Sequence, residues 1–253
     1  LFIPLLTVLM SLNIGFLLLE VVGRTDIALH LARTAILVFC VLMGILGGRV
    51  IPFFTIAGAR LEPIAQPFWI TPLLSIVSIA GTLVFLVGGF VELPLSPAIL
   101  MIFSGLIHLF RLSFWRSKAT FNIPLLWSLH LSYFALGAGL ILMGISYFSE
   151  LIGFSSALHV ITISAMGLMI FAMMCRVSLG HTGRALNPHK VVSLIFLFIF
   201  LSAISRVMLP LFNESLLGWF ISTSLWVLAG TAFLVIYFSI LTSKKIEKHF
   251  YKN

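Results

Sequence analysis

Residues 157–179 read ALHVITISAMGLMIFAMMCRVSL, and this stretch decides the fold class. A helix needs about 20 mostly apolar residues to cross the roughly 30 Å hydrocarbon core of a bilayer. The stretch is long enough, and its only formal charge is Arg176, close to its end. Because lipid cannot satisfy exposed backbone groups, a run of this kind is expected to be a membrane-spanning helix.

The composition of the whole chain agrees with this interpretation. Of 253 residues, 61% are apolar and 9% are charged, whereas a soluble domain carries about 25% charged residues. A soluble enzyme, a disordered tail and a secreted disulfide scaffold are therefore excluded. The cysteines, Cys40 and Cys175, lie in separate apolar segments without a CxxC motif, so neither a disulfide framework nor a zinc–thiolate site is supported.

Similar apolar stretches recur along the chain and predict eight spans. We place them near residues 1–19, 29–47, 69–90, 95–112, 124–148, 157–179, 190–209 and 216–241. The predicted fold class is all-α, a polytopic transmembrane bundle that forms a single domain over residues 1–253. Leu1 opens inside an apolar run, so we expect the chain to be the C-terminal portion of a longer protein.

Charged residues then predict the orientation. Alternate connections place on one side Arg49, Arg60, Arg111, Arg116, Lys118, Arg176, Arg184, Lys190, Lys244, Lys245, Lys248 and Lys252. The other side receives only Arg24, Arg33 and Arg206. By the positive-inside rule the first side, with the C-terminal tail, is cytoplasmic. The net charge of +8 thus reports topology, and no nucleic-acid partner is expected.

Histidines within the spans are the first candidates for a functional site, because burying an ionisable group in a membrane is costly. His108, His130 and His181 fall toward the cytoplasmic side, and His30 and His159 toward the other. Neutral imidazole is the usual ligand of haem iron and of copper, so two separate metal centres are one interpretation. The other is that each histidine only hydrogen-bonds a neighbouring helix. His189 and His249 fall in polar connections.

Side chains near these histidines can also be interpreted either as part of a ligand site or as ordinary packing. Tyr133, one turn beyond His130, could hydrogen-bond a bound ligand or a backbone carbonyl. The helical face with His130, Gly137 and Gly144 would admit a porphyrin or only a close helix. Methionine side chains along one face of the sixth span could offer thioether ligands to copper or simply fill the core; they are Met166, Met169 and Met173.

Four arginines at the cytoplasmic boundary are candidates for contacts to haem propionates or other anions. They are Arg49, Arg111, Arg176 and Arg184. The alternative is that they only anchor helix ends at the membrane surface. Gly47, Gly48, Gly180 and Gly183 lie beside them and are expected to form turns that end helices.

Three segments together resemble the NnrS family of bacterial haem- and copper-containing membrane proteins. They are GGRVIPFFT (47–55), RLSFWRSKATFNIPLLWSLHLSY (111–133) and ALHVITISAMGLMIFAMMCRVSLGHTGRAL (157–186), within a similarity over about residues 25–240. Two features depart from the family pattern. The early His-x-His-Glu element is absent, and Ile56-Ala57-Gly58 stands where an Arg-Asn pair is common.

The resemblance implies a bacterial inner-membrane protein of about twelve helices, so further amino-terminal helices are expected partners of this chain. It implies haem, of b type, and copper as cofactors, and nitric oxide as the ligand. The expected role is in denitrification or nitrosative stress, either binding nitric oxide or protecting cellular iron centres; whether it is an enzyme stays open. His130, His159 and His181 lie inside the matching motifs and are the implied ligands, with His108 just outside.

Two further functions are compatible with the residues. A b-type cytochrome could use the two histidine levels as two haems that pass electrons across the membrane. A small-anion permease could use the arginines at the helix ends to bind its substrate.

Overall fold

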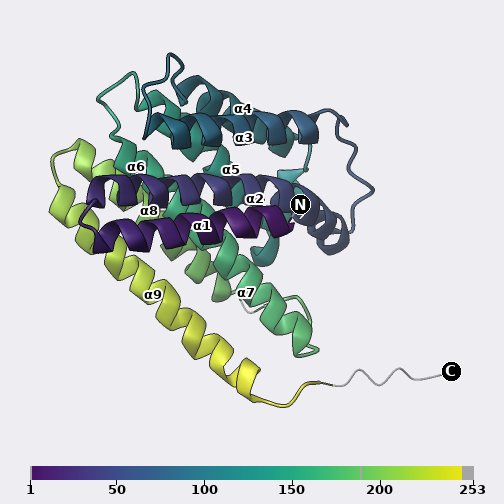
Figure 1. The fold of residues 1–253 in the computed structure, drawn as a ribbon. Helices are drawn as coiled ribbons and strands as arrows, with labels where there is room; N and C mark the ends of the chain where they lie inside the picture. The colour runs from purple at the N-terminus through teal and green to yellow at the C-terminus, as the bar shows by residue number, and fades with distance from the viewer. Residues whose placement is uncertain (1, 189, 247–253) are drawn as a thin grey trace.

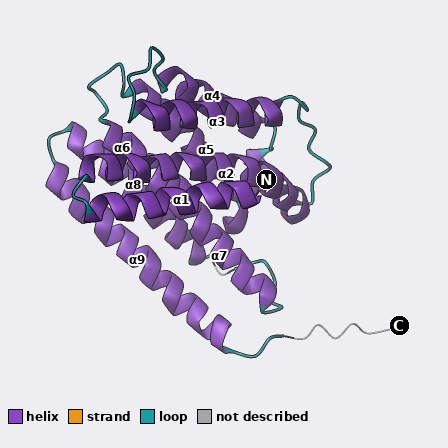
Figure 2. Ribbon diagram, viewed as in Figure 1, coloured by secondary structure: helices purple, strands orange, loops and turns teal. Residues whose placement is uncertain are grey.

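The computed structural model describes residues 2–188 and 190–246, and in these residues it contains helices and no strand. Figures 1 and 2 show the arrangement. The longer helices are, in chain order, α1 (Phe2–Val21), α2 (Thr25–Ala59), α3 (Ile70–Gly88), α4 (Ala98–Ser113), α5 (Pro124–Ile145), α7 (Leu168–His181), α8 (Val192–Leu211) and α9 (Ser215–Thr242). A 3₁₀ turn, η1 (Ser117–Thr120), precedes α5.

The sixth crossing is continuous but not uniform. The short helix α6 (Phe154–His159), the π-helical segment η2 (Val160–Gly167) and α7 follow one another without a break. Together they form one apolar span, Phe154–His181, and the described chain has seven spans of this length. Helix α4 is also apolar but shorter than a usual span. The all-α, polytopic membrane fold is therefore confirmed, with seven long apolar helices in the described chain.

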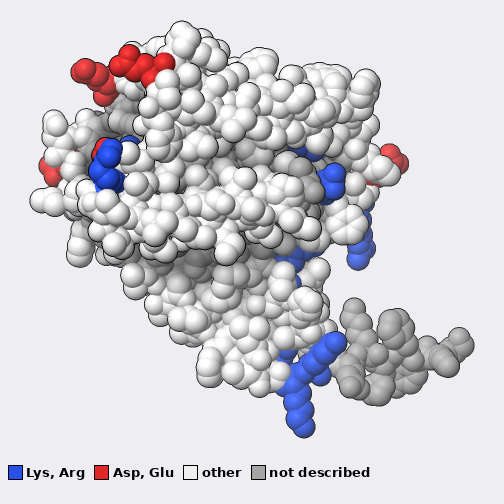
Figure 3. Space-filling model, viewed as in Figure 1, with Lys and Arg blue, Asp and Glu red and all other residues white. Residues whose placement is uncertain are grey.

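Helix α5 holds the bundle together because it contacts α2, α4, α6, η2, α7 and α8. Helix α1 packs on α2 and is largely exposed, and α9 runs diagonally away from the bundle beside α8 (Figure 1). The visible face is almost free of charge, and its charged side chains gather near the ends of the helices (Figure 3). A surface of this kind suits contact with lipid. The cytoplasmic location of one end stays a prediction, and Lys248 and Lys252 lie outside the described residues.

The boundary of the second span is the largest departure from expectation. Helix α2 continues through Gly47 and Gly48, and through Pro52, to Ala59. The prediction that Gly47 and Gly48 form a turn is therefore wrong; they admit side chains from other helices, as described below. Gly180 also stays inside helix α7, but Gly183 has a positive φ of 74° just after it. That conformation suits glycine and ends the helix as expected.

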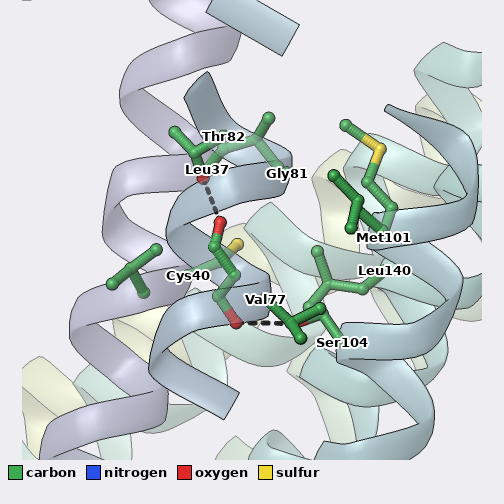
Figure 4. Close-up of a pocket in the computed structure, with 11 residues that line it drawn as sticks. Leu37, Cys40, Val77, Gly81, Thr82, Met101, Ser104 and Leu140 are labelled. Atoms are coloured by element: carbon green, nitrogen blue, oxygen red, sulfur yellow. Dashed lines mark hydrogen bonds between the residues drawn. The ribbon is translucent and has the colours of Figure 1, made fainter. Parts of the chain in front are cut away.

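The centre of the bundle is tightly packed. Figure 4 shows a cavity of only about 10 Å³ among α2, α3, α4 and α5, lined mostly by apolar side chains such as Cys40 and Leu140. One pair of hydroxyls, Ser78 and Ser104, bridges α3 and α4 at 2.7 Å. This volume would hold at most one water molecule, so this cavity is too small for a cofactor.

Helices α4 and α5 approach most closely at glycines. A Cβ atom on Gly105 would lie 2.5 Å from the carbonyl oxygen of Gly137, and one on Gly144 would lie 2.6 Å from that of Ala98. Because these neighbours are backbone atoms, they cannot move aside without separating the helices. The glycine face of α5 is therefore a helix-packing face, which is the second of the two interpretations of that pattern.

We predict that Gly105→Ala lowers the free energy of unfolding by about 1–3 kcal/mol, because it forces two packed backbones apart. Gly230→Ala is the matched control, since a Cβ there meets nothing within 4 Å. It should be neutral or slightly stabilising, as alanine favours helix over glycine. Thermal unfolding of both variants in one detergent measures the difference. Equal midpoints would contradict the packing assignment.

Candidate functional site

A buried arginine lies at the junction of α2, α3 and α4. Arg111 on α4 is only 1% exposed, and its guanidinium donates to the Gly44 carbonyl at 3.2 Å and to the Gly48 carbonyl at 3.1 Å. It also donates to Thr71 Oγ1 at 3.0 Å and to Gln66 Oε1 at 3.4 Å. No carboxylate pairs with it among the described residues, where Arg24–Asp26 is the one recorded ion pair.

The sequence of α2 explains how this arginine is accommodated. A Cβ on Gly48 would overlap the guanidinium at 2.0 Å, so only glycine leaves the room. Pro52 has no N–H, and in a helix the residue four positions earlier then loses its hydrogen-bond donor. That residue is Gly48, whose carbonyl is thus free to accept from Arg111. The Gly-Gly-x-x-x-Pro pattern of residues 47–52 therefore builds the acceptor site.

His108 and Tyr133 complete this buried cluster. Their rings meet edge to face with centroids 5.0 Å apart, and Trp115 packs against Tyr133 at 4.4 Å. A Cβ on Gly44 would contact the His108 ring at 2.7 Å. Both ring nitrogens of His108 and the Tyr133 hydroxyl are buried without a hydrogen-bond partner. Such orphaned groups are rare, and neither side chain lines any of the grooves described here.

His130 has a different environment, in which both ring nitrogens are occupied. Nε2 lies 2.8 Å from Thr55 Oγ1, and Nδ1 lies 2.8 Å from Ser117 Oγ. The Thr55 hydroxyl donates its proton to the Ile51 carbonyl at 2.7 Å, so it accepts from His130 Nε2–H. Ser117 then donates to Nδ1. The imidazole is a neutral Nε2–H tautomer without a free lone pair.

His159 presents a free nitrogen to a groove. Its Nδ1 lies 2.5 Å from the Ser155 carbonyl, which can only accept, so Nδ1 carries the proton and Nε2 the lone pair. The groove has a volume of about 320 Å³ and is bounded by η2, α8 and α9. Its lining includes Thr162, Ser222, Trp226 and, from α8, Arg206.

The π-helical segment begins directly after His159. Its wider turns are uncommon and are frequently found at functional sites. Ser164 within it has a buried hydroxyl without a partner, and Gly167 ends it against the Trp226 ring, 2.6 Å from where a Cβ would lie. The segment therefore shapes the wall of the His159 groove.

His30 also keeps one nitrogen free. Its Nε2 donates to the Leu86 carbonyl at 3.1 Å, and its ring stacks on Phe85 at 4.6 Å, so Nδ1 carries the lone pair. It lines a groove of about 570 Å³ that also contains Glu92 and Tyr147. Burial raises the pKa of the Tyr147 phenol, so that group stays protonated at neutral pH.

The remaining candidates lie apart from these histidines. His181 is exposed at the end of α7, and Arg49 is exposed on α2. Arg176 is buried with its guanidinium 3.7 Å above the Phe54 ring. Arg184 donates to the Ile240 carbonyl at 3.3 Å and to Ser243 Oγ at 2.6 Å, which ties the end of α7 to the end of α9. His189 and His249 lie outside the described residues.

The structure thus brings together some candidates and separates others. A chain of ring contacts connects His108 to His130 through Tyr133 and Trp115, and the last contact joins Trp115 to His130 at 6.1 Å. His30 and His159 line different grooves. Within the part of the chain that the structure describes, no three His, Cys, Asp or Glu side chains form a metal-binding group. The methionine stripe, Met166, Met169 and Met173, packs against the hydrophobic core.

Several residues of these sites gave little signal in the sequence. Thr55 and Ser117 bond His130 from 75 and 13 residues away, and Gln66 reaches Arg111 from a loop. Arg206 counted only toward membrane orientation. Its place near the end of α8, at a level that matches that of His159 in α6, was a signal that the two share a site.

We predict that Arg111→Lys lowers the free energy of unfolding by about 1–3 kcal/mol, because an ammonium cannot reach acceptors on α2, α3 and the 60–69 loop at once. Arg49→Lys, at an exposed position on α2, should have no measurable effect. Thermal unfolding in detergent compares the two variants. A stable Arg111→Lys protein would mean that a point charge suffices at this junction.

Comparison with known proteins identifies one family. The family model described as NnrS protein matches residues 1–245, which include every helix from α1 to α9. No curated protein and no solved structure matches the chain. The match covers nearly the whole sequence and agrees with the multi-pass helical architecture. This chain belongs to the NnrS family of membrane proteins.

Proposed function

We propose that the protein acts in the bacterial nitric oxide response from the inner membrane, holding haem and copper, and that it binds nitric oxide or protects cellular iron centres. Membership of the NnrS family supports a role in the nitric oxide response. The observation that carries the cofactor proposal is the state of His159. It has a fixed tautomer, a free Nε2 lone pair and a groove in front of it.

Metal-binding histidines typically donate their other ring N–H to a carbonyl or carboxylate, which fixes the tautomer and orients the ring. His159 does this through Ser155, and His30 does it through Leu86. Each therefore suits the role of a single ligand to haem iron or copper. A haem iron with an open position supplies reversible binding of nitric oxide when the cofactor is present.

The residues at the other end of the helices support a ligand role less well. His108 has free nitrogens but lines none of the grooves described here, and His130 lines a groove but has no free lone pair. His181 is exposed at the end of α7. An electron-transfer cytochrome needs ligands at both levels, so no observation favours that alternative. The grooves of His30 and His159 lie at one end of the bundle, which favours one ligand-binding end.

We predict that the purified full-length protein carries haem, and that His159→Ala loses most of it because the variant lacks the imidazole that would hold the iron. Haem content per protein is measured by the pyridine haemochrome spectrum and copper by elemental analysis. His181→Ala is the matched control, since it removes an exposed imidazole from the same span. It should keep the haem content of the wild type.

Equal haem content in the two variants would remove His159 from the ligand set. A folded wild-type protein without colour or metal would overturn the cofactor proposal itself. Nitric oxide added to the reduced protein should shift the Soret band if the haem keeps an open position. An unchanged band would argue for protection of iron centres without direct binding.

A further inference from the structure

Arg206 occupies the His159 groove at the same level as the imidazole. It lies five residues before the end of α8 at Leu211, and His159 lies five residues after the start of α6 at Phe154. At 1.5 Å per residue, both are about 7.5 Å from their helix ends. Ser222, seven residues into α9, lies about 10 Å from its end. Three helices thus bring polar groups to one level.

The charge of Arg206 has no anionic partner in the described chain. Its guanidinium lies 4.8 Å above the Trp219 ring, and it makes no ion pair or hydrogen bond with a described residue. The nearest acidic residues in the sequence, Glu150 and Glu214, are exposed in connections. A half-buried cation at this depth is costly unless an anion accompanies it, so the edge of the guanidinium is available for a ligand.

The other walls of the groove add hydrogen-bonding groups and one flat apolar surface. The Ser202 hydroxyl contacts Ser222 Oγ at 3.0 Å, and Thr223 adds a further hydroxyl to the lining. The indole of Trp226 forms an aromatic wall, since Gly167 allows the π-helical backbone to approach its edge. A flat ring therefore has a surface to stack on and an anion-binding fork beside it.

We propose that Arg206 holds a carboxylate of a flat, apolar ring ligand in this groove. The inference rests on the proposed function, because a haem bound to His159 would present its propionates to Arg206. Arg206 is not one of the four arginines that the sequence suggested as anion contacts, and it lies at the other end of the helices from them. A guanidinium pairs with a carboxylate through two parallel hydrogen bonds, which lysine or glutamine cannot reproduce.

Metal-free protoporphyrin IX tests this contact separately from metal ligation. The full-length protein in phosphatidylcholine vesicles is titrated with protoporphyrin IX and with its dimethyl ester, and binding is followed by quenching of tryptophan fluorescence. Protein-free vesicles give the background partitioning. The wild type should bind the free acid about tenfold more tightly than the ester, because only the acid offers a carboxylate.

Arg206→Gln should weaken binding of the free acid about tenfold and leave binding of the ester unchanged. Arg33→Gln is the matched control, since Arg33 also stacks on an aromatic ring, Phe154 at 5.3 Å, but does not line the groove. It should bind both porphyrins like the wild type. Thermal unfolding confirms that each variant is folded, and the acid-versus-ester comparison in the wild type needs no variant.

Equal affinity of the wild type for the acid and the ester overturns the inference, as does an equal loss of both on Arg206→Gln. The proposed function fails in a different way. If haem content does not depend on His159 while the free acid still depends on Arg206, the carboxylate site stands and the iron ligand is wrong. If His159→Ala loses haem but the wild type does not prefer the free acid over the ester, His159 remains the proposed iron ligand and the carboxylate site at Arg206 is wrong.

Discussion

The constraint on which the packing of α2, α3 and α4 depends is a buried positive charge without a buried negative one among the described residues. Arg111 is fully enclosed, and carbonyls, a hydroxyl and an amide replace the carboxylate that usually accompanies such a group. The Gly48 carbonyl is available because Pro52 cannot donate to it. A proline would weaken the middle of a soluble helix. Here the carbonyl that Pro52 leaves without a donor accepts a hydrogen bond from the neighbouring helix α4.

This arrangement also shows which parts of the fold could be predicted. The membrane-spanning helices follow from the apolar runs, because a run of about 20 apolar residues satisfies its own backbone groups in lipid when it is helical. The role of each glycine does not follow in the same way. Gly47 and Gly48 have the local pattern of a turn, but their neighbours in space are Tyr133 and Arg111, which are far away in the sequence. A glycine in a helix indicates that another group packs closely there, but the sequence does not identify that group.

The candidate site also has features that the sequence predicts and features that it does not. Membrane depth located the histidines, since it depends only on distance from helix ends. The state of each imidazole depends on its partners. His159 takes its tautomer from Ser155, four residues earlier, a local contact. The tautomer of His130 is set by Thr55 and Ser117, which lie on other elements. The sequence suggested His130 as a metal ligand because it does not show that these two hydroxyls occupy both ring nitrogens.

Space alone does not distinguish the two ends of the bundle. The groove beside His130 has a volume of about 420 Å³, larger than the 320 Å³ beside His159. What differs is the availability of a lone pair, because two hydroxyls occupy the nitrogens of His130 and one carbonyl occupies a single nitrogen of His159. Ligation through His130 Nδ1 would require the Ser117 hydroxyl to find another acceptor. Ligation at His159 would leave its hydrogen bond intact and strengthen the ring as a donor to the metal. The histidine whose existing contacts survive ligation is the better ligand, and this criterion selects the end that also carries the unneutralised charge of Arg206.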